Sequence, residues 1–213
     1  VFGMLTIEAP PEGYMADFVP KGGAFNTKQY EAREVIRTAT YYKLFLIQTF
    51  SIPAFVLISS IFVSFGTSKG LDTALLVAGV SVASLFQVAG RFIISSVSDK
   101  ISTKNSMILV FIITILAVIL LTFSSGYVYL VCFWLLSFAY GGSAATIPSL
   151  TTDYFGVKNA GVIVSLVLIG MGVSSICTPL IAKAAGVNTS FIIAAAAGIV
   201  GILLVFSLPK KQK

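Results

Sequence analysis

Long stretches without a charged residue constrain this chain more than any other feature of its sequence. Leu44 to Ser68 and residues 105 to 152 carry no charge, and Thr73 to Ser98 carries only Arg91. Residues 159 to 182 and 184 to 209 are uncharged as well. An ionised side chain at the centre of a bilayer costs at least about 2.5 kcal/mol. The stretches between the charges therefore predict segments that cross a membrane.

The composition agrees with this interpretation and excludes several functions. Of the 213 residues, 57% are hydrophobic and only 10% are charged, whereas a soluble domain carries about 25% charged residues. We therefore expect an integral membrane protein surrounded by a lipid bilayer. The chain has no His and only eight acidic residues, which leaves few groups for acid–base or metal chemistry. We predict no enzymatic activity, no metal site and no cofactor.

The lengths of the uncharged stretches predict six crossings. Residues 105 to 152 span about twice the roughly 20 residues that one helix needs, and Ser124, Ser125 and Gly126 supply a turn in between. Unbroken apolar stretches fit helices rather than the alternating strands of a barrel. The predicted fold is thus an all-α membrane protein with six transmembrane helices, at about residues 44–67, 73–97, 106–123, 126–147, 160–182 and 189–208.

Residues 1–43 differ in character from the rest of the chain. Val1 to Ile7 resembles the end of a preceding helix, and the prolines at positions 10 and 11 favour a solvent-exposed linker. Acidic and basic residues mix with apolar ones from Thr27 to Tyr42, which predicts a short amphipathic helix in the membrane interface. We expect this chain to be part of a longer protein.

The basic residues predict the orientation in the membrane. Only Lys69 and Lys183 fall on one side of the six predicted crossings, whereas eleven fall on the side of the two termini: Lys21, Lys28, Arg33, Arg37, Lys43, Lys100, Lys104, Lys158, Lys210, Lys211 and Lys213. Positive loops face the cytoplasm, so both termini are expected to be cytoplasmic. The net charge of +6 is then a signal of topology, and no nucleic-acid partner is predicted.

A polar stripe on the second predicted helix is the strongest candidate for a substrate path. Ser84, Gln87, Arg91 and Ser95 follow one another at steps of three, four and four residues, which places them on one helical face. A helix that lines water needs such a face. Polar residues on other helices extend the candidate binding site to Gln48, Tyr140 and Ser174. The Gly and Ser residues of the fourth and fifth helices also suit close helix packing, which stays open as an alternative.

Arg91 admits three interpretations. Asp99 lies eight residues further along the same helix, about 12 Å away and out of reach. The guanidinium could pair with a loop carboxylate such as Asp153, or extend towards the membrane surface. It could also hold an anion in a water-filled cavity, because its planar fork matches a carboxylate.

Two segments resemble the major facilitator superfamily. In the loop from Gly90 to Lys104, Asp99, Lys100 and Lys104 fit the signature between paired helices, although Ser95 and Ser102 stand where that signature has Gly. The run from Tyr140 to Gly161, together with the Pro-Pro-Glu-Gly-Tyr linker, is similar to the C-terminal half of the oxalate:formate antiporter branch, which includes monocarboxylate carriers.

The resemblance implies a fold, a partner and a mechanism. It implies the C-terminal six-helix bundle of a transporter that works by alternating access, with an N-terminal six-helix half as its partner and the substrate between the halves. Arg91 matches an anion-binding arginine of the oxalate carrier, but residues 169–172 lack that carrier's second cation, a lysine. A monocarboxylate such as lactate or formate is therefore favoured over oxalate. The implied cytoplasmic gate contains Asp99, Lys100, Lys104 and Asp153.

Two other functions remain open at this point. One is a facilitator for another solute, such as a sugar or a drug, and the other is a self-contained six-helix carrier that dimerises. For a facilitator of organic anions, we expect the inner membrane of a bacterium as the location. The only cavity charge that the sequence offers, on Arg91, is positive, which argues against a path for cationic drugs.

Overall fold

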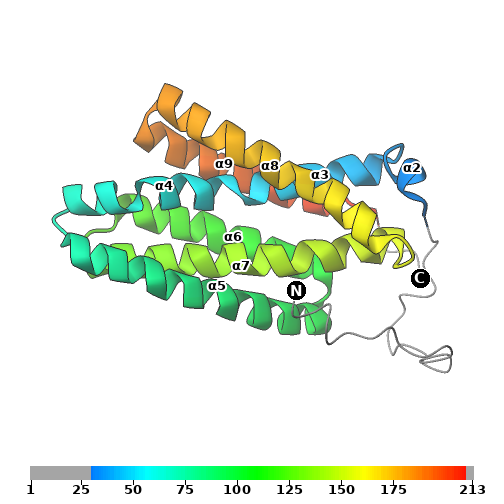
Figure 1. Cartoon of the computed structure of the whole chain (residues 1–213), viewed down its shortest axis with the longest axis horizontal. Helices are drawn as coiled ribbons and strands as arrows, with labels where there is room; N and C mark the ends of the chain where they lie inside the picture. Colours follow the sequence, from blue (N-terminus) through cyan, green and yellow to red (C-terminus); the bar gives the residue numbers. More distant parts are fainter. Residues whose placement is uncertain (1–29, 210–213) are drawn as a thin grey trace, which may run out of the picture.

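The structure is a computed structural model that describes residues 30–209, except for the side chains of three residues at the turn between the last two helices. The expectations for residues 1–29 lie outside the described residues. The described chain is helical, and its helices run roughly along the long axis of the molecule (Figure 1). They are α2 (Ala32–Val35), α3 (Ala39–Ser51), α4 (Pro53–Ser68), α5 (Thr73–Ile101), α6 (Thr103–Phe123), α7 (Tyr127–Phe155), α8 (Ala160–Ala185) and α9 (Val187–Phe206).

The predicted fold class is confirmed. Within residues 30–209, six segments are long and apolar enough to cross a membrane, with α3 and α4 together forming the first of them. Two helices run further than the charge pattern predicted, because α5 continues to Ile101 and α7 to Phe155. Each ends where the next residue takes a positive φ, 86° at Ser102 and 81° at Gly156. The charge pattern indicates which part of a helix lies in the hydrocarbon of the membrane. The helix itself continues beyond that part until the backbone turns.

The first crossing is broken where the sequence has a proline. Helix α3 ends at Ser51 and α4 begins with Pro53 at its first position, where the missing N–H of proline is tolerated. In the described part of the segment before this crossing, residues 30–42 do not form the one predicted helix, because α2 ends at Val35 and α3 begins at Ala39. Thr38 has an extended backbone and its side chain accepts a hydrogen bond from the N–H of Tyr41. This cap ends the preceding turn and starts α3.

Helix α7 is the centre of the bundle, whereas α5 and α8 are the most open helices. In α7, 61% of the residues in its most apolar stretch are buried, whereas in α5 and in α8 only 22% of the corresponding residues are buried. Figure 1 shows α7 between α5 and the upper group of α8 and α9. The two helices that carry Arg91 and Ser174 thus leave most of their surface uncovered by the described chain.

Lysine side chains close the ends of two helices. Lys43 donates to the carbonyl of Ser207 at 2.6 Å, and Lys104 donates to the carbonyls of Phe206 and Leu208 at 3.2 and 3.0 Å. At the opposite end of the bundle, Lys69 donates to carbonyls that end α6. A cation at a helix C-terminus satisfies free carbonyls and complements the helix dipole.

Candidate functional site

The candidate site is positioned by an unusually close contact between α5 and α7. A Cβ atom added at Gly90 would lie 2.1 Å from the carbonyl oxygen of Phe138, and one added at Gly141 would lie 2.1 Å from that of Gln87. Glycine at both positions lets the two backbones touch, as small residues do at membrane helix interfaces. The contact fixes the segment from Gln87 to Arg91 against the segment from Phe138 to Gly141.

Arg91 and Tyr140 lie on the two helices of this contact, Arg91 directly after Gly90 and Tyr140 directly before Gly141. The Arg91 guanidinium is close enough to the Tyr140 hydroxyl to interact with it electrostatically. The Tyr140 ring stacks on Phe55 of α4, with ring centroids 4.1 Å apart and planes 13° from parallel. This stack orients the Tyr140 ring, and Arg91 lies on the exposed surface of α5.

The structure gives no carboxylate partner to Arg91. Among residues 30–209 no ion pair joins Arg91 to Asp or Glu. Asp153, one of the partners considered from the sequence, accepts a hydrogen bond from the Thr103 hydroxyl at 2.6 Å. The guanidinium, with five N–H donors, is thus exposed and without an ion pair among residues 30–209.

The rest of the polar stripe also lies on an open surface. Ser84 and Ser95 are exposed and Gln87 is half-buried, and the Ser84 hydroxyl donates to the carbonyl of Val80 at 3.4 Å. Apolar residues on other sides of α5 are exposed too, including Leu85 at 69%. Helix α5 therefore presents both a polar face suited to water and apolar faces suited to lipid or to other helices.

Gln48 and Ser174 belong to other helix contacts than the one that unites Gln87, Arg91 and Tyr140. Gln48 of α3 is 2% exposed, and the Ser51 hydroxyl donates to its carbonyl at 2.8 Å. Ser51 in turn accepts a hydrogen bond from Ser143 of α7 at 3.1 Å. The sequence does not reveal Ser51 and Ser143 as a pair, because the spacing of residues along one helix does not show which residues of two helices face each other.

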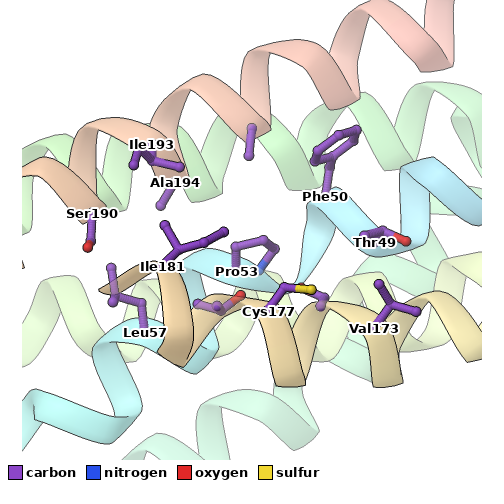
Figure 2. A pocket seen from close by; sticks show the side chains of 13 residues that line it. Thr49, Phe50, Pro53, Leu57, Val173, Cys177, Ile181, Ser190, Ile193 and Ala194 are labelled. Carbon is purple, nitrogen blue, oxygen red and sulfur yellow. The ribbon is translucent and has the colours of Figure 1, made fainter. Parts of the chain in front are cut away.

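Ser174 lines a cavity of about 170 Å³ between α3, α4, α8 and α9. Figure 2 shows Pro53, Cys177 and Ile181 at its centre, with Ser190 and Ile193 contributed by α9. The Oγ of Ser174 and the Oε1 of Gln48 are both buried and have no hydrogen-bond partner among the described residues. Ser174 was a candidate binding residue from the sequence, whereas the cavity around it could not be predicted from the sequence.

The four residues assigned to the gate lie at the ends of helices. Asp99 and Lys100 are exposed in the last turns of α5. Lys104 donates to the end of α9, and Asp153 joins the end of α7 to the start of α6 through Thr103. Lys104 and Asp153 thus fasten helix ends within this bundle, whereas Asp99 and Lys100 remain on its surface.

The described residues contain no group of three or more His, Cys, Asp or Glu side chains placed to hold a metal ion. The two cysteines are free, with Cys132 buried and Cys177 exposed. The chemistry available at the α5–α7 contact is therefore hydrogen bonding and charge, supplied by a guanidinium, a phenol and an amide.

The comparisons with known proteins agree with a transport function. Residues 40–213 match the sequence profile of the Major Facilitator Superfamily. The chain is also similar to the Uncharacterized MFS-type transporter YhjX of Escherichia coli (strain K12), with 26% identity over 109 residues. That match covers 50% of this chain and spans 27% of the length of YhjX. Because the profile covers most of the sequence, the chain belongs to the Major Facilitator Superfamily of membrane transporters.

Proposed function

We propose that this chain is the C-terminal half of a secondary transporter that moves small organic anions by alternating access. The proposed substrate is a monocarboxylate of the size of lactate or formate. One observation carries the proposal: Arg91 lies on an open face of α5 beside Tyr140 and has no carboxylate partner among residues 30–209.

An unpaired guanidinium in a membrane helix favours an anionic ligand. Ionisable residues within membrane segments are costly and face a water-filled path or a partner. In a water-filled path within the membrane, a carboxylate accepts two parallel charge-assisted hydrogen bonds from Arg91. The Tyr140 hydroxyl, with which Arg91 interacts electrostatically, and the Gln87 amide, one turn before Arg91 on α5, are the proposed additional donors. Ser84, Gln48 and Ser174 are proposed to contribute further along the path.

The open surfaces of α5 and α8 support a second half. Transporters of this superfamily are built of two six-helix bundles with the substrate between them near the membrane midplane. The two least buried helices, each 22% buried in its most apolar part, are the ones that a partner bundle would cover. Asp99 and Lys100, which are exposed at the end of α5, are the proposed contacts to that bundle when the cytoplasmic side closes.

The distribution of charge favours a substrate with one negative charge. Arg91 is the only cation within the six described membrane segments that lies away from their ends, since the others are within five residues of an end: Lys43, Lys100, Lys104 and Lys183. A dianion would need a second cation. Asp99 and Asp153 lie in the last turns of their helices and Asp72 caps the start of α5, so the proposed coupling is anion exchange or a proton carried with the substrate. The proposed location is a bacterial inner membrane with both termini cytoplasmic.

A competition experiment tests this proposal. The full-length protein in proteoliposomes is assayed for uptake of labelled lactate and formate against an excess of unlabelled solutes. We expect monocarboxylates to reduce uptake by at least about tenfold, oxalate to compete weakly, and a neutral sugar and a quaternary ammonium ion to leave uptake unchanged. Transport of the sugar or the cation in place of both carboxylates would show that the chain serves another solute.

A further inference from the structure

A second ligand-sized space lies apart from Arg91. The cavity of about 170 Å³ is bounded by α3 and α4 on one side and by α8 and α9 on the other. In Figure 2, Pro53 and Leu57 face Cys177 and Ile181 across it, with Ile193 and Ala194 closing it from α9. Apart from a few hydroxyl groups and one thiol, its lining is apolar.

The backbone explains why a cavity forms here. At Gly170, α8 touches α3 so closely that an added Cβ would lie 2.7 Å from the carbonyl oxygen of Phe45. Eight residues after Phe45, the break at Pro53 separates α3 from α4, and two of the four residues that α9 contributes, Ala194 and Ala197, have small side chains. The helices therefore touch at Gly170 and leave an unfilled volume next to it.

The hydroxyl of Ser174 is a polar group in the wall of this cavity that can form a hydrogen bond. Ser165 and Ser175 on the same helix each donate to the carbonyl four residues before them, at 2.8 and 2.9 Å. Ser174 is 2% exposed and its Oγ has no hydrogen-bond partner among the described residues. A buried polar group without a partner costs about 1–3 kcal/mol, and a ligand with one hydrogen-bonding group removes that cost.

The size, depth and charge of the cavity define the ligand. An apolar cavity of about 150 Å³ holds a molecule such as benzene, and this one is slightly larger. Ser174 lies 14 residues after the start of α8 at Ala160, about 21 Å along the helix, which is too deep for a lipid headgroup. No charged side chain lines the cavity. The cavity therefore suits a small, uncharged ligand.

We propose that this cavity is a second binding site, separate from the anion site, for a small uncharged molecule with one apolar ring or branched chain and one hydrogen-bonding group. Ser174 recognises the polar group, and Pro53, Leu57 and Ile181 contact the apolar part. Phenol is the simplest molecule of this class and is neutral at pH 7. Cys177, which lines the cavity and is exposed, provides a chemical reporter of occupancy.

The test uses two probes that differ by one hydroxyl group, 4-fluorophenol and fluorobenzene. Their binding to the full-length protein in lipid nanodiscs is followed by fluorine NMR, with empty nanodiscs as the reference for partitioning into lipid. We expect saturable binding of both probes and tighter binding of 4-fluorophenol. Ser174→Ala is expected to weaken 4-fluorophenol binding about fivefold, as for the loss of one hydrogen bond, without weakening fluorobenzene binding.

Two further measurements separate this site from the anion site. Bound 4-fluorophenol should slow the reaction of the exposed Cys177 with a maleimide, as measured by peptide mass spectrometry against the same protein without the probe. Ala197→Leu, on a half-buried position of the lining, should reduce binding of both probes, whereas Arg91→Gln should change neither. Absence of saturable binding, an equal loss of both probes in Ser174→Ala, or loss of 4-fluorophenol binding in Arg91→Gln would each overturn the proposal.

Discussion

Replacement of Arg91 by Gln is expected to lower the uptake of lactate and formate by at least about 100-fold. The variant keeps a polar side chain of similar length but removes the charge and the planar fork. Loss of one partner from a desolvated charge pair costs about 3–5 kcal/mol, and each 1.4 kcal/mol is a factor of ten. Arg91→Lys keeps the charge without the fork and is expected to retain about a tenth of the uptake. Initial uptake rates in proteoliposomes measure both variants.

Arg37→Gln is the matched control for this experiment. Arg37 is exposed and lies between α2 and α3, outside the α5–α7 contact, and the change removes the same charge. Its uptake should equal that of the unmodified protein. Equal uptake by Arg91→Gln and Arg37→Gln would contradict the role of Arg91 as the anion anchor.

Replacement of Gly141 by Ala should have the largest effect on the structure itself. The added Cβ would lie 2.1 Å from the carbonyl oxygen of Gln87 and 2.8 Å from its carbonyl carbon. Overpacking costs about 1–3 kcal/mol where side chains can move, and here the obstacle is the backbone of α5. We expect a loss at or above about 3 kcal/mol, seen as a lower thermal unfolding temperature and a lower yield of folded protein.

Two other glycines provide comparisons in which the expected loss of stability is smaller or absent. At Gly142 an added Cβ would lie 2.7 Å from a side-chain carbon of Ile94, which can shift, so Gly142→Ala should have a smaller effect. At Gly172 an added Cβ would meet no heavy atom within 4 Å, so Gly172→Ala should be neutral or slightly stabilising. Equal unfolding temperatures of Gly141→Ala and Gly172→Ala would contradict a close backbone contact between α5 and α7.

The membrane segments could be predicted from the sequence because charge is excluded from hydrocarbon. The same signal could not give the helix ends, since α5 continues past the charged Asp99 and α7 past the charged Asp153, until Ser102 and Gly156 turn the backbone. The break at Pro53 was visible because proline has no N–H. Within residues 30–42 the predicted interfacial helix is divided at Thr38, because the cap at Thr38 has a weaker sequence signal than the surrounding amphipathic pattern.

The candidate site could be predicted in part. The spacing of Gln87 and Arg91 on one face follows from helix geometry alone. That Tyr140 approaches Arg91 depends on the angle and distance between α5 and α7, which Gly90 and Gly141 set through contacts far apart in the sequence. The cavity at Ser174 similarly depends on how α4 diverges from α8. Lys104, chosen from a loop motif, donates to the end of α9, a partner more than a hundred residues away that no local pattern indicates.

The most direct test of an anion-binding Arg91 compares lactate with lactamide, its uncharged analogue of nearly the same shape. Binding of each to the full-length protein in proteoliposomes is measured by competition against labelled lactate. We predict that lactate binds at least about 100-fold more tightly than lactamide, consistent with a charge-assisted pair, and that Arg91→Gln reduces this preference to a few-fold. Equal affinity for lactate and lactamide in the unmodified protein would contradict the account.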